Sequence, residues 1–114
     1  MSKPTIHDDA LYQLLRHEKI EEFNQQRDTL DQSKLKSGDY RGLDLRNINA
    51  NGLDFSDSYL RNADLRGLDL RNTNLEGANL HDAKISGVYF PKPLSATEIR
   101  MSIECGTRLR YRDT

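Results

Sequence analysis

The chain has 114 residues, of which 35% are hydrophobic and 31% are charged, and its formal net charge is −1. This length fits one modest domain, and the low apolar fraction disfavours a conventional two-layer core. The near balance of charge argues against a dedicated polyanion binder and against a strongly acidic decoy surface.

Residues 1–32 are predicted to form an N-terminal helical cap made of two short helices. Asp8 is placed to cap the first helix. The apolar residues would lie on two sides of one continuous helix: Ala10, Leu11, Leu14 and Leu15 on one side, Ile20 and Phe23 on the other. We therefore predict a break near residues 16–19. No signal peptide and no stretch of ~18 apolar residues is recognised, so we expect a cytoplasmic protein.

Residues 33–92 repeat a five-residue pattern twelve times without interruption. The third position is apolar in eleven consecutive pentads: Tyr40, Leu45, Ala50, Phe55, Leu60, Leu65, Leu70, Leu75, Leu80, Ile85 and Phe90. The second position is often Asp or Asn, and the fifth is usually Gly, Asn or Asp, types that tolerate tight turns. A fixed period indicates a repeat architecture. A period of five matches neither a helix nor a continuous strand and suits a short extended side followed by a corner.

The pentads at residues 63–67 (ADLRG) and 78–82 (ANLHD) follow the pattern A-(D/N)-L-x-x. On this pattern, about 60 of the 114 residues resemble the bacterial pentapeptide-repeat family. The resemblance implies an all-β solenoid, a right-handed quadrilateral β-helix of about three coils with four pentads per coil. Residues twenty apart, such as Leu45, Leu65 and Ile85, would then stack.

The first coil is expected to be the least regular part of this solenoid. The family favours a small residue at the first pentad position, whereas this chain has bulky ones at Leu43, Ile48, Leu53 and Leu68. Ala50 is small for a central position. We expect Ile48 and Leu53 to fill the space beside it.

Residues 93–114 are predicted to form a C-terminal helix and tail, which serve as a cap or a dimerisation element. Ser95 and Glu98 match a capping box, and Gly106 stands where a helix often ends in a left-handed residue. Residues 108–112 alternate like a half-buried strand, which can pair with a second copy or discourage pairing through its charges. The candidate apolar contacts of a homodimer are Met101, Ile103, Leu109 and Tyr111.

No group of residues has the spacing of a catalytic or metal site, and no cofactor is predicted. Cys105 is the single cysteine, so an intrachain disulfide is excluded. Neither a Cys/His or HExxH metal pattern nor a glycine-rich phosphate loop occurs. The second-position carboxylates, such as Asp44 and Asp64, are expected to accept backbone hydrogen bonds at corners. We therefore expect that the protein is not an enzyme.

The fourth pentad position points outward in this frame and carries a series of basic side chains. The candidate interaction residues are Arg41, Arg46, Arg61, Arg66, Arg71 and His81. Two interpretations remain open. These side chains could form a basic edge for an acidic partner or for nucleic acid phosphates. Alternatively, Asp44 and Asp64 neutralise Arg46 and Arg66 and leave a solvated surface that adds little to stability.

The leading functional hypothesis is a non-catalytic interaction or scaffold module whose rigid charged sides face another macromolecule, most simply a protein. A membrane partner is not expected. One alternative follows from the family resemblance: some pentapeptide-repeat proteins are DNA mimics that bind DNA gyrase or topoisomerase. Their rods are typically longer, dimeric and strongly acidic, whereas residues 33–92 here carry nine basic and eight acidic side chains. The other alternative is binding of nucleic acid or an acidic protein through the outward arginines.

Overall fold

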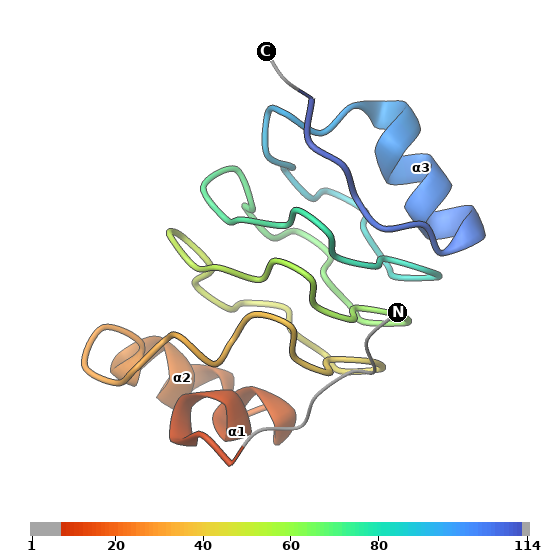
Figure 1. The fold of residues 1–114 in the computed structure, drawn as a ribbon. Coiled ribbons are helices and arrows are strands. Elements are labelled where there is room, and N and C mark those ends of the chain that lie inside the picture. The colour runs from red at the N-terminus through yellow and green to blue at the C-terminus, as the bar shows by residue number, and fades with distance from the viewer. Residues whose placement is uncertain (1–7, 113–114) are drawn as a thin grey trace.

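The computed structural model describes residues 8–112, which contain three helices and a stack of coils (Figure 1). Helices α1 (Ala10–Arg16) and α2 (Ile20–Gln26) lie at one end of the stack, and α3 (Ala96–Cys105) lies at the other. None of the helices in this described part is long and apolar enough to cross a membrane.

Helices α1 and α2 are separated by a sharp turn at Glu18, which has a left-handed φ of 56°. The N-cap of α1 is Asp9, one residue after the predicted Asp8, because the Asp9 carboxylate is the group that accepts the Tyr12 N–H. The side chains that α1 buries are Leu11, Tyr12 and Leu15. The turn lets α2 bury Phe23 against the same core without a long helix that would have to bury two faces.

The backbone of the repeat region pairs with the next coil at a spacing of twenty residues. Parallel bridges join Asp39 with Tyr59, Asp44 with Asp64, Asp54 with Asn74, Tyr59 with Asn79, Asp64 with Lys84, and Asp69 with Tyr89. At one of them, Leu45 N–H donates to the Asp64 carbonyl at 3.0 Å and Asp64 N–H donates to the Leu43 carbonyl at 2.9 Å. One turn therefore takes four pentads, as the family resemblance implies.

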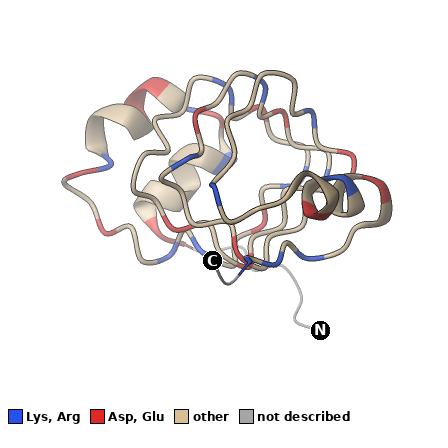
Figure 2. Ribbon diagram, turned by 90° about the horizontal axis from the view of Figure 1, so that it is seen from above, with Lys and Arg blue, Asp and Glu red and all other residues tan. Residues whose placement is uncertain are grey.

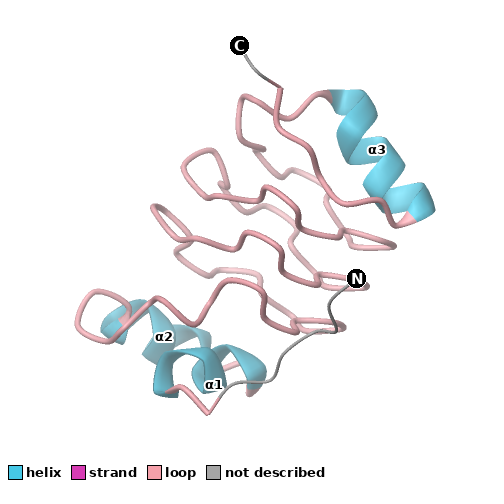
Figure 3. Ribbon diagram, in the orientation of Figure 1, coloured by secondary structure: helices cyan, strands magenta, loops and turns pink. Residues whose placement is uncertain are grey.

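The paired segments are too short to form strands. Within residues 8–112 the pairing consists of isolated bridges, and no strand or sheet is present (Figure 3). The all-β solenoid expected from the sequence is thus found only in part, since the coils stack but their sides do not extend into ladders. The cause is the corner in each pentad, which ends a side before a second pair of residues can form a bridge.

Ten of the twelve pentads place their fifth residue in the left-handed region. Positive φ values between 56° and 80° occur at Ser37, Gly42, Asn47, Gly52, Asp57, Asn62, Gly67, Gly77, Asp82 and Gly87. Glycine has no Cβ that clashes in this conformation, and Asn and Asp tolerate it better than other residues. At Gly77 the need is also spatial, because an added Cβ would run into the Asp57 carboxylate. The composition of the fifth position therefore has a backbone cause.

The third-position side chains stack into columns that fill the interior of the coils. Leu45 and Leu65 are each 2% exposed, one above the other in such a column. At the N-terminal end the Tyr40 ring meets Tyr12 and Phe55 edge to face, with centroids 5.4 and 5.2 Å apart. The column thus continues from the coils into α1, and the helices and the repeats share one core.

The first coil departs from this regular pattern at Ala50, as the sequence predicts. No bridge joins Asn49 to Asp69 among the described residues; the Asn49 N–H instead donates to Asn24 Oδ1 at 2.8 Å. A void of about 10 Å³ lies in the core beside Ala50 and is lined by apolar side chains. That volume is at the lower limit for one water molecule, so this void is too small for a ligand.

Side chains from the N-terminal helices and the residues near them satisfy the edge of the first coil. The Tyr12 hydroxyl donates to the Asp39 carbonyl at 2.9 Å and accepts the Asp39 N–H at 3.2 Å. Arg16 Nη1 donates to the same carbonyl at 3.3 Å. Further around the coil, other side chains make hydrogen bonds to its backbone. Glu18 bonds to Asp44, Asn24 to Asn47 and Asn49, and Arg27 to Asn49 and Asn51.

Helix α3 and the tail cover part of the last coil. The helix begins at Ser95, whose Oγ accepts the Glu98 N–H, and ends at Gly106 with φ 72°, as the capping box and the glycine predict. Ser102 Oγ accepts the Leu80 N–H at 2.9 Å. In the tail, Leu109 exchanges backbone hydrogen bonds with Gly77 and Ala78 at 2.7 and 2.9 Å.

The remaining part of the last coil is left without such cover. The backbone N–H groups of Ile85, Gly87 and Phe90 make no hydrogen bond to any described residue. One coil lower, the equivalent groups of Leu65, Gly67 and Leu70 donate to carbonyls at 2.7–2.9 Å. The upper end of the stack therefore keeps a partly unpaired edge.

Candidate functional site

The outer wall of the coils repeats one hydrogen bond inside eight of the twelve pentads. An Asp or Asn side chain at the second position accepts the backbone N–H of the fourth residue, at 2.9–3.3 Å. The residues that accept in this way are Asp39, Asp44, Asn49, Asp54, Asp64, Asp69, Asn74 and Asn79. The bond closes a local turn that only a short polar side chain can make, which confirms the structural role expected for these carboxylates.

Four pentads add an ion pair to this turn. In each, the Nε of the fourth-position arginine donates to Oδ1 of the second-position aspartate at 2.9–3.0 Å, and Nη2 donates to Oδ2 at 2.7–2.8 Å. The pairs are Asp39–Arg41, Asp44–Arg46, Asp64–Arg66 and Asp69–Arg71. Two parallel bonds fix the guanidinium plane as well as its position, so each arginine is held in one orientation on the wall.

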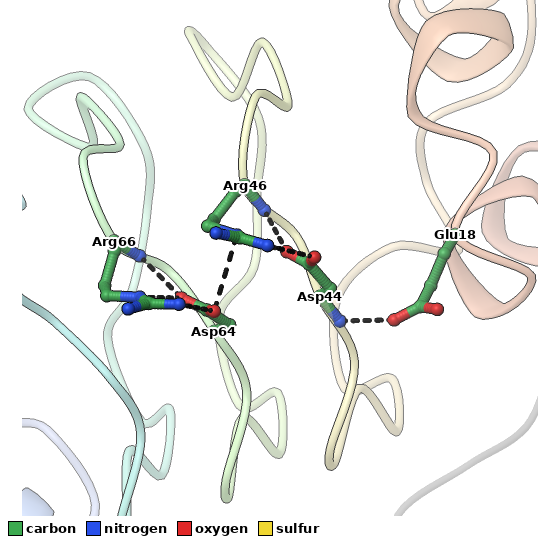
Figure 4. Close-up of polar contacts among 5 residues, drawn as sticks. All are labelled: Glu18, Asp44, Arg46, Asp64 and Arg66. Atoms are coloured by element: carbon green, nitrogen blue, oxygen red, sulfur yellow. Dashed lines mark hydrogen bonds and ion pairs between the residues drawn. The ribbon is translucent and has the colours of Figure 1, made fainter.

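Two of these pairs are linked across neighbouring coils (Figure 4). Arg46 holds Asp44 in its own pentad and also lies 3.4 Å from Asp64 Oδ2 in the next coil, which Arg66 already holds. The hydrogen bonds from Arg66 are the main cause that lowers the pKa of Asp64 to about 2, and the charge of Arg46 lowers it further. The charges therefore form a connected row in place of separate free ions.

The predicted outward arginines are thus present on the surface but are mostly neutralised. Side chains of the paired arginines are 45–62% exposed, so they face solvent while bound to aspartate. Viewed along the stack, basic and acidic positions lie close together around the coils (Figure 2). Of the two interpretations of these residues, the geometry favours the solvated, self-neutralised surface over an unbroken basic edge.

Arg61 is the exception among the five arginines. Its pentad has Tyr59 at the second position where the other four have aspartate, and the Arg61 side chain makes no ion pair or hydrogen bond within residues 8–112. His81, one coil further on, lies 3.8 Å from the Asp82 carboxylate. Arg61 shares an open depression with Arg16 of α1. No sequence signal marks Arg16, because only the packing of α1 on the coils brings it there.

The four residues proposed for a dimer are not one exposed surface. Leu109 is 1% exposed and lies against its own coil, which makes its assignment as an intermolecular contact wrong. The Tyr111 hydroxyl accepts the Leu75 N–H at 2.8 Å, so this side chain too is used within the chain. Ile103 is partly buried, whereas Met101 is 39% exposed. Dimerisation through this segment stays a prediction, with Met101 as its most accessible contact.

The described residues hold no cluster of three His, Cys, Asp or Glu side chains that could bind a metal ion. Cys105 is exposed at the end of α3. Four of the second-position aspartates, Asp39, Asp44, Asp64 and Asp69, are each paired with an arginine of their own pentad.

Stacked twenty-residue coils, corners at every fifth residue and an outer wall of Asp and Asn turns together define a solenoid repeat protein. The family model for pentapeptide repeats matches eight copies over residues 30–67, 41–77 and 54–90. The chain belongs to the pentapeptide-repeat family. Such repeats generally form a right-handed β-helix, and proteins of this family are generally not enzymes. Comparisons with curated proteins and with solved structures give no match.

Proposed function

We propose that the protein is a non-catalytic interaction module that presents the rigid outer wall of its coils to another protein. The observation that carries this proposal is the set of four Asp–Arg pairs, each fixed to a backbone turn and each with an exposed arginine. Side chains held in this way lose little conformational freedom when a partner binds, which favours association. Membership of the pentapeptide-repeat family supports a non-catalytic interaction role.

The charge pattern bears on the class of partner. A nucleic acid binder gains most of its affinity from arginines and lysines that neutralise phosphates. Here Arg46, Arg66 and Arg71 are already neutralised by aspartates of their own pentads. A DNA mimic needs the opposite, an acidic surface, and the same arginines interrupt it. Nucleic acid binding and DNA mimicry are therefore both less favoured than a protein partner that contacts the paired charges of the wall.

The finer description of the fold belongs to the same proposal. Residues 33–92 would form a right-handed quadrilateral β-helix, with residues 1–32 and 93–114 as its terminal caps. The family and the twenty-residue bridges support this description. A cytoplasmic location stays a prediction.

The test starts with capture of partners from native lysate by the immobilised full chain. Leu65→Asp is the control, because a carboxylate in the buried column should unfold the coils. A retained protein is then purified and mixed with the full chain, and hydrogen exchange is measured on the complex. We expect protection along the outer positions of the repeats. If every retained protein is also retained by Leu65→Asp, or if the partner is chemically altered on mixing, the proposal fails.

The alternatives are tested separately. A labelled DNA duplex and a labelled single strand should show no saturable binding even at low salt, whereas a phosphate-driven binder would bind and weaken steeply as salt rises. Purified gyrase should supercoil DNA at an unchanged rate in a large molar excess of the protein. Saturable, salt-sensitive DNA binding or gyrase inhibition would replace the proposed function by the corresponding alternative.

A further inference from the structure

An open depression lies where α1 meets the outer wall of the first two coils. Its volume is about 480 Å³, and it is lined by Arg16, Asp39, Arg41, Arg61 and Asn62. Three guanidinium groups face one carboxylate here, an excess of two positive charges. This differs from the rest of the wall, where each arginine of the repeated pairs has its own aspartate.

The single carboxylate of the depression is already occupied. Asp39 accepts from the Arg41 backbone N–H, from Arg41 Nε and from Arg41 Nη2, at 2.8–3.1 Å. Its side chain is 6% exposed, and the bonds from Arg41 lower its pKa. Asp39 therefore serves to fix Arg41 in place, and it has little capacity left to neutralise the other two arginines.

The other two arginines keep donors that no described residue uses. Arg16 donates one bond, from Nη1 to the Asp39 carbonyl. Arg61 donates none within residues 8–112, because Tyr59 replaces the aspartate that would hold it. These donors come from α1, the first coil and the second coil, which share one packed core. The fold consequently sets where the backbones of the three arginines lie relative to one another.

We propose that this depression is a binding site for a phosphate group carrying two negative charges. Paired guanidinium donors match the oxygens of phosphate in geometry as well as in charge, and two charges balance the local excess. The depression is shallow and polar, which suits a charged headgroup and not an apolar ligand. The depression shares the Asp39–Arg41 pair with the proposed protein-binding wall, but the binding of phosphate needs no partner protein.

The site is tested by titrating the full chain with inorganic phosphate at constant ionic strength, made up with chloride, and following the arginine Nε–H signals by NMR. We expect saturable shifts at Arg16, Arg41 and Arg61. Arg61→Gln should weaken the binding of phosphate by about tenfold, the factor expected for one lost charge-assisted hydrogen bond. The matched control is Arg71→Gln, at the same pentad position outside the depression, which should leave binding unchanged.

A second variant tests whether the lack of an aspartate at position 59 is what leaves Arg61 available to phosphate. Tyr59→Asp restores the aspartate found in the other four pentads and should tie Arg61 to it, so phosphate binding should fall about as much as in Arg61→Gln. Phosphoserine is the further probe: tighter binding than inorganic phosphate assigns the site to a phosphate ester, and weaker binding assigns it to the free ion. Shifts that do not saturate, or equal affinities in the wild type, Arg61→Gln and Tyr59→Asp, would overturn the proposal.

Discussion

At the N-terminal end of the stack, side chains close the backbone edge, whereas at the C-terminal end backbone groups take over much of that work. Tyr12, Glu18 and Asn24 reach three successive sides of the first coil. At the other end, Leu109 pairs with the last coil through its own N–H and C=O. The helices and the turn between them thus cover three sides of the first coil, while the tail covers only the sides along which it runs.

This difference explains why the upper edge is left partly unpaired. The carbonyl of Ile103 and the hydroxyl of Ser102 meet one side of the last coil, and Leu109 meets the next. The Arg112 N–H donates to the Pro93 carbonyl and not to the coil, and the N–H groups of Ile85 and Phe90 make no bond to a described residue. An unpaired edge of this kind is where coils would continue to stack if the repeats went on.

The largest effect is expected when the N-terminal cap is broken at Tyr12. Tyr12→Ala should lower the free energy of unfolding by about 3–5 kcal/mol, because it leaves a cavity beside Tyr40 and removes both bonds to Asp39. Denaturant unfolding followed by circular dichroism measures this. Tyr12→Phe keeps the ring and should cost about 1–3 kcal/mol. A loss below about 1 kcal/mol in Tyr12→Ala would show that α1 is not part of the cooperative core.

A smaller effect is expected at the C-terminal cap. Ser102→Ala removes the Oγ that accepts the Leu80 N–H in a fully buried place and should cost about 1–3 kcal/mol. Ser86→Ala is the control, since that serine is exposed, and it should change stability by less than about 0.5 kcal/mol. Equal unfolding curves for Ser102→Ala and the wild type would mean that α3 does not close the stack.

The sequence predicts those features of the molecule that depend on neighbouring residues, in the repeats and at the two ends of α3. The apolar third position and the Gly, Asn or Asp at the fifth give the five-residue frame, because both depend on residues within one pentad, whereas the twenty-residue register comes from the family resemblance. The capping box at Ser95 and the end at Gly106 are equally local.

What the sequence did not reveal depends on packing between distant segments. Leu109 looks like a contact for another molecule until the tail is laid on the coil. Arg16 has no motif, and its place beside Arg61 follows from how α1 docks on the core. The missing strands have a different cause, since the pentad period alone does not say whether a side is long enough for more than one bridge.

Hydrogen exchange of single amides would sharpen the contrast between the covered and uncovered sides. The N–H groups of Leu65 and Leu70 donate to the next coil, and we expect them to exchange only on global unfolding. The groups of Ile85 and Phe90, one coil further on, should exchange at least about tenfold faster. Equal protection at all four positions would mean that another molecule covers the upper edge, which light scattering would reveal as a dimer.

The smallest expected effect is the pH dependence of stability that comes from the Asp–Arg pairs on the outer wall of the coils. Because Arg66 lowers the pKa of Asp64 to about 2, the folded protein binds fewer protons there than the unfolded chain, whose aspartates titrate near 4. The contribution of the Asp64–Arg66 pair to the free energy of unfolding is therefore fully present above about pH 4 and is lost as the pH falls towards about 2. Asp64→Asn keeps the turn, as Asn74 and Asn79 do in their pentads, and removes the charge.

Thermal unfolding between about pH 5 and pH 2 measures this dependence. Asp64→Asn should lose less stability over that range than the wild type does. Asp54→Asn is the matched control, because Asp54 makes the same turn with Ser56 but has no arginine in its pentad. If the two variants change the acid dependence equally, the linked pairs are no more than solvated surface charges. If only Asp64→Asn changes it, the ion pairs of Asp64, chiefly the one with Arg66, stabilise the folded coils between caps of two different kinds.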